Sequence, residues 1–272
     1  MSFSARIVPE ARKYGAAARV AMLDRWRYPA ELVGPCVTLG LFVFVFSCIW
    51  TSAFVGKATI SGYTRQACTW YFVFAEICYF CSSGAFASLS QDIKDGQVAY
   101  TLARPYHLVL ATWAQRLGIG LSLAPILFAV GYVIASSVAG PWIPDSMLRG
   151  GAVLVSFVLS ISLHVLLQAC MALVAFWFEE NSAFLWIFAK ITLVAGTLMP
   201  LEFLPASWQE VLLWFPFPWL VWAPAKLAVV PDLDLAMAGF LLGGQMAWLL
   251  LSLALAAGVF HLAVRHATVH GG

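Results

Sequence analysis

The chain has 272 residues, of which 62% are hydrophobic and 10% are charged, and it contains 12 Trp and 20 Phe. This composition excludes an ordinary soluble domain, and a net charge of only +2 gives no reason to expect a nucleic-acid partner. We therefore expect an all-α integral membrane protein, because backbone polar groups must be satisfied internally in lipid and a helix of roughly 20 apolar residues crosses it.

The first 31 residues are basic and polar. Within them, residues 4–28 mix apolar and basic side chains as a helix at the membrane surface does, and Pro29 would turn the chain into the bilayer. A disordered basic tail is the alternative, because the apolar periodicity is imperfect. No small-residue cleavage site follows, so we do not expect a removable signal peptide.

Six segments are long and apolar enough to be membrane spans. Three of them, residues 32–55, 117–140 and 235–264, contain no Asp, Glu, Lys or Arg. The other three are each interrupted by one ionisable residue: residues 66–90 by Glu76, residues 150–178 by His164 and residues 182–201 by Lys190.

The distribution of Lys and Arg predicts the orientation. Basic residues are enriched in cytoplasmic segments, so the basic N-terminal segment is placed in the cytoplasm, and six spans return the C-terminus to the same side. On this side lie Arg6, Arg12, Lys13, Arg19, Arg25, Arg27, Lys94, Arg104, Arg116 and Arg265, and on the other lie Lys57, Arg65, Arg149 and Lys226.

A polar segment, residues 92–105, separates the second and third spans. Asp92 and Asp95 suit the first turn of a helix, Val98 and Leu102 follow at i and i+4, and Pro105 ends it. The pattern predicts a short amphipathic helix. Because this helix has no core of its own, a partner protein or the lipid headgroup layer should cover its apolar side.

Residues 201–234 contain two apolar halves that are each too short to cross the membrane. They are separated by a break at Phe215, Pro216, Phe217 and Pro218, which Trp219 follows. Proline removes a backbone donor and stops a helix, so the pattern predicts a re-entrant or interfacial hairpin between the fifth and sixth spans. A seventh span, which would export the C-terminus, is the alternative.

The polar residues within the spans are candidate functional residues, because a charge in lipid is costly unless it is paired or hydrated. Glu76 and Lys190 lie at similar depths, which permits an ion pair. Such a pair would either fix helix packing or line a polar path. His164 and Gln168, at i and i+4, share a helix face and could join the same network, with His164 as a satisfied interior residue rather than a proton relay.

Motifs for nucleotide, serine-hydrolase and zinc chemistry are absent from the sequence. Any ATPase must therefore lie in another chain. Cys78 and Cys81 form a C-x-x-C without a second pair, which is a weak redox or metal signal. We expect all six cysteines to pack as small hydrophobic residues: Cys36, Cys48, Cys68, Cys78, Cys81 and Cys170.

Three stretches, together with the basic N-terminal segment, carry a resemblance to a known family. They are DGQVAYTLARPYHLVLATWAQRLG (residues 95–118), FWFEENSAFLWIFAK (176–190) and GTLMPLEFLPASWQEVLLWFPF (196–217). In these, and along nearly its whole length, the sequence resembles the six-helix ABC type-2 export permeases, and more narrowly their uncharacterised permease branch. The motifs are loose, so they indicate architecture better than substrate.

The resemblance implies that the segment between the second and third spans is a cytoplasmic coupling helix that docks on a separate ATP-binding-cassette ATPase, which would bind ATP and Mg while this chain binds no cofactor or metal. The N-terminal helix would touch the same subunit, and Phe215 to Trp219 would belong to an outer gate. A second permease copy or a related permease would complete the path in a prokaryotic plasma membrane. The contacts to the ATPase would come from Asp92, Asp95, Val98, Tyr100, Leu102 and Arg104, with Pro105 fixing the turn.

The sequence thus predicts one transmembrane permease domain over residues 1–272, with a cytoplasmic interfacial segment (1–31), a membrane domain (32–264) and a cytoplasmic tail (265–272). The absence of a large external loop favours a lipid or amphipathic small molecule as substrate. Two other functions stay open. A membrane enzyme of lipid or isoprenoid metabolism would use Asp92 and Asp95 with Asp232 and Asp234, although the topology separates these pairs. A secondary transporter would need midplane ion sites and internal repeats, for which there are only Glu76 and Lys190.

Overall fold

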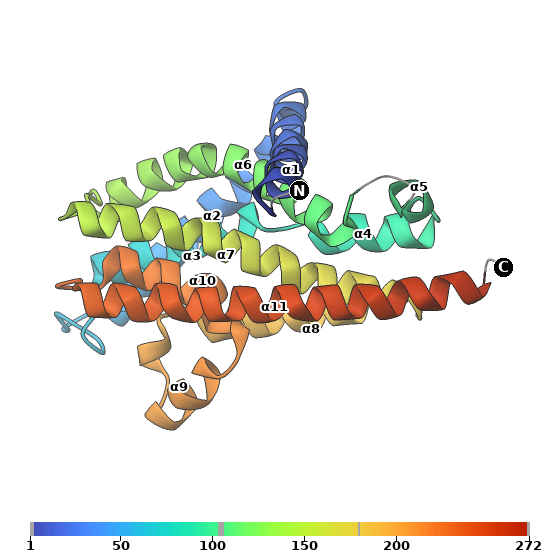
Figure 1. Ribbon diagram of the computed structural model, residues 1–272. Helices are drawn as coiled ribbons and strands as arrows, with labels where there is room; N and C mark the ends of the chain where they lie inside the picture. Colours follow the sequence, from blue (N-terminus) through green and yellow to red (C-terminus); the bar gives the residue numbers. More distant parts are fainter. Residues whose placement is uncertain (1–2, 103–105, 179, 271–272) are drawn as a thin grey trace.

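The computed structural model describes residues 3–102, 106–178 and 180–270, and the regular elements in these ranges are helices (Figure 1). The first six α-helices are α1 (Phe3–Arg25), α2 (Ala30–Ala53), α3 (Arg65–Cys81), α4 (Ala85–Lys94), α5 (Val98–Leu102) and α6 (Leu108–Ala139). They are followed by α7 (Met147–Leu173), α8 (Ser182–Thr192), α9 (Ala206–Leu213), α10 (Pro216–Val229) and α11 (Leu235–His270). A 3-10 turn, Val174–Phe176, follows α7, a π-helical turn, Leu193–Thr197, extends α8, and a second 3-10 turn, Leu201–Phe203, precedes α9.

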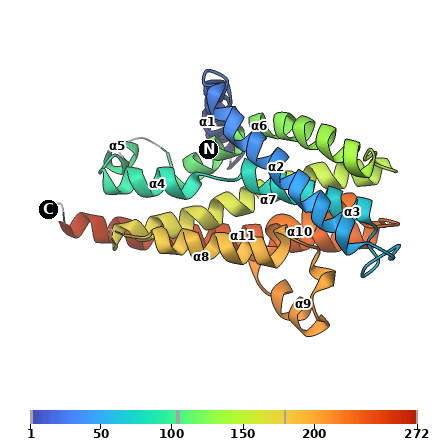
Figure 2. The same cartoon turned by 180° about the vertical axis from the view of Figure 1, so that it is seen from behind.

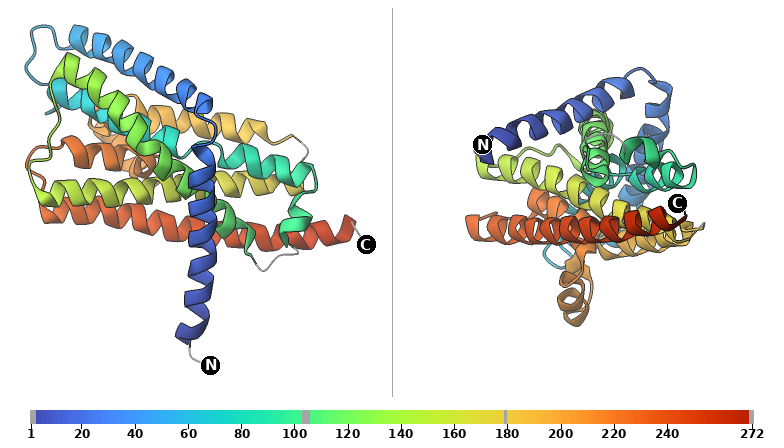
Figure 3. Two further views of the ribbon diagram at one scale, coloured as in Figure 1. Left: turned by 90° about the horizontal axis from the view of Figure 1, so that it is seen from above. Right: turned by 45° about the vertical axis from the view of Figure 1, so that its right-hand side comes forward.

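The helices form an elongated bundle with two distinct ends (Figures 1 and 2). The loops over residues 54–64, 140–146 and 230–234 lie together at one end, which we call the loop end. Helices α4 and α5 and the end of α11 lie at the other, which we call the terminal end. Helix α1 crosses the bundle at a steep angle between the two ends (Figure 3). The protein therefore has a long helical body on one side of α1 and a protruding part on the other.

Helix α1 packs on the first turns of α6, so the predicted N-terminal helix is confirmed over its described length. Gly118 makes the close approach possible, because a Cβ there would lie 2.2 Å from the Ala18 carbonyl oxygen. The hydroxyl of Tyr14 accepts a hydrogen bond from the His107 backbone N–H at 3.1 Å. These contacts hold α1 as an ordered helix rather than as the alternative, a disordered tail.

The described residues contain five helices that are long and apolar enough to cross a membrane, or six if α9 and α10 are counted as one bent span. The predicted span over residues 182–201 is shorter in the structure, where the apolar helix covers Ser182–Thr197. Its end follows from Gly196, whose backbone leaves helical geometry, and from Pro200. At the C-terminal end of the chain, α11 continues to His270, so most of the predicted tail over residues 265–272 is helical.

The second predicted span is divided in two. Helix α3 ends at Cys81 and α4 begins at Ala85, and Gly84 between them has a φ of +92°. Residues with a side chain rarely adopt this backbone conformation, so glycine allows the break. The predicted span over residues 66–90 is thus confirmed as one apolar stretch, Arg65–Lys94, whose helix is interrupted between α3 and α4 (Figure 1).

Helix α10 lies in the middle of the bundle, where it packs on α3, α7 and α11. Trp219 sits against α11 at Gly244, where a Cβ would lie 2.1 Å from the indole ring. Polar contacts join the same helices, because Gln245 accepts a hydrogen bond from Ser156 at 2.7 Å and donates to the Trp219 carbonyl at 3.0 Å. The core therefore combines close glycine contacts with satisfied polar groups.

Candidate functional site

The segment predicted to bind a partner forms an elbow rather than one helix. Asp92 lies in the last turn of α4, Asp95 caps the C-terminal end of that helix, and Gly96 has a φ of +70° before the five-residue α5 begins. The predicted helix that starts at Asp92 is therefore wrong. The glycine, which the sequence suggested would only weaken a helix, permits the change of direction between α4 and α5.

Residues that contact an ATPase subunit should be exposed, and among the predicted contacts Val98 does not meet this expectation. Asp92, Asp95 and Tyr100 are exposed, and Tyr100 keeps 77% of its surface accessible. Val98 is buried and belongs to the same apolar cluster as Phe86 and Leu89, so it anchors the elbow within its own chain. Leu102 ends α5, while Arg104 and Pro105 lie outside the described residues.

Side chains from α7 hold the break before α4. His164 Nδ1 and the Ser82 hydroxyl form a hydrogen bond of 2.8 Å, and Gln168 donates to the Ser82 carbonyl at 3.0 Å. The Gln168 side-chain oxygen accepts from the Phe86 backbone N–H at 3.2 Å. His164 and Gln168 thus share a helix face as predicted: Gln168 satisfies two backbone groups at the break, and His164 holds the Ser82 side chain.

A further contact fixes the other end of α4. Ser90 on α4 donates to the side-chain oxygen of Asn181 at 2.9 Å, and Asn181 contacts the last carbonyls of α7. Helix α4 is consequently held against α7 at both of its ends. The sequence did not single out Ser82, Ser90 or Asn181, because their partners are 82 to 91 residues away.

The suggested ion pair between Glu76 and Lys190 does not form. Glu76 is buried, whereas Lys190 is exposed on α8 and lies 6.0 Å from the ring of Trp186 on its own helix. No ion pair joins the two residues in the part of the chain that the structure describes. A similar depth along two helices does not by itself produce an ion pair. Here Glu76 lies in the interior of the bundle, whereas Lys190 lies on its outer surface.

The predicted break between two short apolar helices before α11 is present, but only the first of these helices, α9, lies at the surface. Helices α9 and α10 meet at an angle of 109°, and the break follows Trp214. Phe217 near the start of α10 contacts Phe188 of α8 at 5.8 Å, while the end of α10 reaches the loop end. An interfacial position is therefore wrong for α10, which is a core helix, whereas α9 projects from the side of the bundle (Figure 1).

The residues predicted to form an outer gate, Phe215 to Trp219, lie partly at the surface and partly in the core. Phe215 is exposed, and Pro216 is the first residue of α10, where proline is well tolerated because the missing N–H has no helical partner. Pro218 and Trp219 are buried in the core, and Phe217 is partly buried. Only the start of this stretch is available to a neighbouring molecule.

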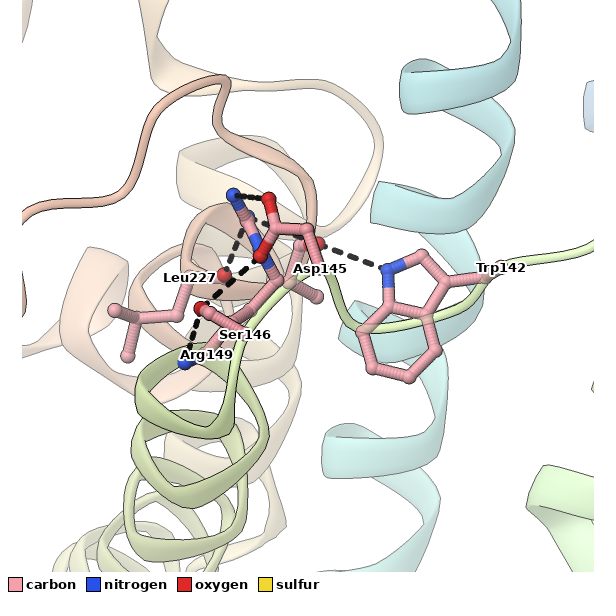
Figure 4. Close-up of polar contacts among 6 residues, drawn as sticks. Trp142, Asp145, Ser146, Arg149 and Leu227 are labelled. Carbon is pink, nitrogen blue, oxygen red and sulfur yellow. Dashed lines mark hydrogen bonds and ion pairs between the residues drawn. The ribbon is translucent and has the colours of Figure 1, made fainter.

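An ion pair at the loop end anchors α10 (Figure 4). Arg149 Nε and Nη2 donate to the two carboxylate oxygens of Asp145 at 2.7 and 2.8 Å. Arg149 Nη1 also donates to the carbonyls of Leu227 and Ala228 at 3.1 and 3.3 Å. A cation at the C-terminal end of a helix is favourable, so this buried arginine caps α10. The guanidinium lowers the pKa of Asp145 below its ordinary value.

A second polar cluster ties the hairpin to the loop after α2. Glu202 forms an ion pair with Lys226 of α10 and accepts hydrogen bonds from Tyr63 at 3.0 Å and Trp222 at 3.3 Å. Burial, followed by the nearby carboxylate, raises the pKa of Tyr63.

The i,i+4 spacing of Asp145 and Arg149 was a local signal for an ion pair. Glu202 and Lys226, at 24 residues apart, offered no such signal.

The two aspartate pairs weighed for a metal-dependent enzyme lie at opposite ends of the molecule. Asp92 and Asp95 belong to the elbow at the terminal end, and Asp232 and Asp234 to the loop between α10 and α11 at the loop end (Figure 1). They cannot share one metal ion. In the described ranges, no group of three or more His, Cys, Asp or Glu residues is arranged to hold a metal, and the six cysteines are free thiols.

Comparison with known proteins agrees with this architecture. Residues 37–271 match the family described as ABC-2 family transporter protein, so the match runs from within α2 to the end of α11. No curated protein matches the sequence. The matched region covers most of the chain, and the multi-pass helical membrane fold fits a transport subunit that is not itself catalytic. The chain therefore belongs to the ABC-2 transporter family, as a membrane permease of an ABC exporter.

Proposed function

We propose that this permease moves a lipid or amphipathic small molecule out of the cell, and that the elbow of α4 and α5 receives the motion of a separate ATPase subunit. The observation that carries the proposal is the combination of an exposed, acidic elbow with a helix that is clamped to the core at both ends. A rigid lever with an unpartnered tip suits the transmission of force from another protein.

The route of transmission follows the contacts. Movement of the elbow would displace α4, because Val98 is packed on the same apolar cluster as α4. Helix α4 would carry α7 with it through Asn181 and Gln168. Helix α7 in turn packs on α10 and α11, so a shift at the terminal end reaches the re-entrant helix. The break at Gly84 lets α4 move relative to α3 without distorting a continuous helix.

The position of α1 supports cytoplasmic termini and an ATPase on the terminal side. Helix α1 carries exposed Val20 and Leu23 beside its basic residues, with exposed Trp26 directly after it, and it lies across the bundle, as a helix at the membrane surface does (Figure 3). The elbow and the end of α11 protrude beyond it. We infer that α1 marks the cytoplasmic surface of a prokaryotic plasma membrane and that the loop end faces outward.

A pair of permeases is part of the proposal. Helices α2 and α11 bury only about a fifth of their most apolar windows, at 22% and 17%. Within a bilayer, lipid can cover such surfaces, but α9 adds a projecting face that carries Trp208, Val211 and Trp214. A second permease copy, or a related permease, would enclose a path between the two bodies. The ATPase would supply the ATP and Mg sites.

The test is affinity purification of the tagged chain from its native membranes in mild detergent, followed by mass spectrometry. We expect an ATP-binding-cassette subunit in stoichiometric amount. The variant Asp95→Lys with Tyr100→Ala reverses one exposed charge and removes one exposed ring, and it should lose most of that subunit because both changes fall on the elbow.

A matched control makes the same changes elsewhere. Glu210→Lys with Trp214→Ala alters an exposed acid on α9 and an aromatic residue, 79% exposed, that directly follows this helix. This variant should retain the ATPase subunit. If no ATPase accompanies the wild-type chain, the proposed function is wrong. If the elbow variant and the control retain it equally, coupling occurs at another surface.

A further inference from the structure

Two neighbouring cavities lie in the half of the bundle next to the loop end, and no residue of either was used above for transport. The first is an apolar groove of about 400 Å³ between α6 and α7, with α3 and α10 behind it. Its lining includes Phe74, Phe128, Phe157 and Pro224, and every side chain that lines it is apolar. Leu154 lines the groove and is 70% exposed, so the groove opens sideways toward the membrane.

The second cavity is polar, measures about 270 Å³, and lies at the loop end. Asp145, Arg149, Gln66 and Trp70 contribute to its lining. Trp142 lines both spaces, so the polar cavity and the groove adjoin at this residue. Trp142 Nε1 donates a hydrogen bond to the Ala228 carbonyl at 2.9 Å, and this bond holds the indole ring in place (Figure 4).

The hydrogen bonds of the ion pair determine what the polar cavity can bind. Arg149 has already committed four hydrogen bonds to Asp145 and to the carbonyls of α10, and its side chain is only 5% exposed. The Asp145 side chain is 61% exposed and accepts three hydrogen bonds, two from Arg149 and one from Ser146, so about one of the roughly four acceptor positions of its carboxylate stays free. The cavity therefore offers an accessible anion beside two indole rings, which favours a cationic donor.

From this arrangement we propose that the groove and the polar cavity form one binding site for a membrane lipid with an amine-bearing head group. The acyl chain lies in the groove between α6 and α7, and the ammonium group lies beside Asp145 and Trp142. The groove is long enough to hold part of an acyl chain, because it extends from Gly150 in the first turn of α7 to Phe157, about 10 Å along the helix. A lateral opening gives direct access from the bilayer.

This inference deepens the proposed function, because it names the chemical class of the amphipathic molecule, but binding itself does not require an ATPase. The experiment uses the purified full-length chain in nanodiscs. The probes are phosphatidylethanolamine and phosphatidylglycerol that carry the same photoreactive acyl chain. We expect phosphatidylethanolamine to crosslink several-fold more strongly, with crosslinked peptides from α6 and α7.

Adjacent glycines provide a matched pair of variants. Gly150 lines the groove and Gly151 does not, and a Cβ at either position meets no atom within 4 Å. Gly150→Leu should fill the groove and remove the α6 and α7 crosslinks, and Gly151→Leu should keep them. Leu154→Trp, at the mouth of the groove, is a second blocking variant if Gly150→Leu does not yield folded protein. Asp145→Asn should keep the crosslinks and lose the preference for phosphatidylethanolamine.

The outcomes separate the parts of the proposal. Equal crosslinking of α6 and α7 in wild type and in both blocking variants would overturn the acyl-chain site. Equal crosslinking of the two lipids to the wild-type chain, or an unchanged preference in Asp145→Asn, would overturn the amine-bearing head group. Neither result depends on an ATPase subunit, so these failures are distinct from a failure of the proposed function.

Discussion

The loop end and the terminal end of the bundle are built differently. At the loop end, charged and aromatic side chains bind backbone carbonyls of other segments: Arg149 binds the end of α10, Trp142 binds Ala228, and Trp70 binds Gly140. At the terminal end, polar contacts hold α4 to α7, and the elbow beyond them presents Asp95 and Tyr100 to its surroundings.

The difference indicates which end is complete in one chain. Arg149, Trp142 and Trp70 at the loop end all find their hydrogen-bond partners inside the protein, so this end is held together by contacts within one chain. At the terminal end, Asp92, Asp95 and Tyr100 of the elbow stay exposed among the residues that the structure describes. The following substitutions test this contrast, because loop-end changes should lower stability and terminal-end changes should mainly affect local order.

The largest effect is expected from Arg149→Met. The variant leaves the Leu227 carbonyl without its donor and removes the charge at the end of α10, and hydrogen bonds to charged groups contribute about 1.5–3 kcal/mol. The thermal unfolding midpoint in detergent should fall accordingly. Arg65→Met is the control, since Arg65 is exposed at the same end. An equal change in both variants would mean that the cap on α10 is unimportant.

The next effect concerns the core beside α10. Gly244→Ala places a methyl group against the ring of Trp219, and overpacking a core costs about 1–3 kcal/mol. Gly243→Ala is one residue away, where a Cβ meets no atom within 4 Å, and it should be neutral or slightly stabilising because alanine favours helix. Thermal unfolding of the two variants compares them directly. Similar midpoints would contradict the close contact of α11 with Trp219.

A smaller, local effect is expected at the junction of α1 and α6. Gly118→Ala forces a Cβ against the Ala18 carbonyl, so α1 must shift away, while the rest of the bundle keeps its contacts. Hydrogen exchange of the α1 amides should accelerate with little change in the global unfolding midpoint. Gly15→Ala, on α1 itself, has open space at its Cβ and should leave exchange unchanged or slower. Faster exchange throughout the bundle would show that α1 is part of the core.

The smallest effect is a pH dependence at the terminal end. His107 precedes α6 and packs on Phe260 of α11 at 4.8 Å, and burial lowers its pKa below the ordinary value of 6.5. The unfolded chain then binds the proton more readily, so stability is full above pH 6.5 and falls as the pH drops below it.

Hydrogen exchange near His107 measures this effect, and His107→Gln should remove it. The loop end should not respond in the same range, because the pKa of Asp145 is depressed below 3.8 and its contribution is lost only in stronger acid. If the loop end also loosens just below pH 6.5, a different group controls its stability.

Much of the fold was predictable because its signals are local. Long apolar runs identify α2, α6, α7 and α11 without any tertiary information, since a bilayer accepts only segments that satisfy their own backbone. The prolines after Phe215 predicted the break before α10, and the spacing of His164 and Gln168 predicted their shared face. These features depend on residues within a few turns of one another.

Only the tertiary structure determined how these pieces meet. The depth of α10, the outward position of Lys190 and the burial of Val98 depend on rotations and contacts among helices that are distant in sequence. Arg149 finds its carbonyl partners 78 and 79 residues away, and Gln168 finds Ser82 at a separation of 86. Hydropathy and helix periodicity define which residues enter the membrane, but the packing of complete helices decides which polar groups face one another.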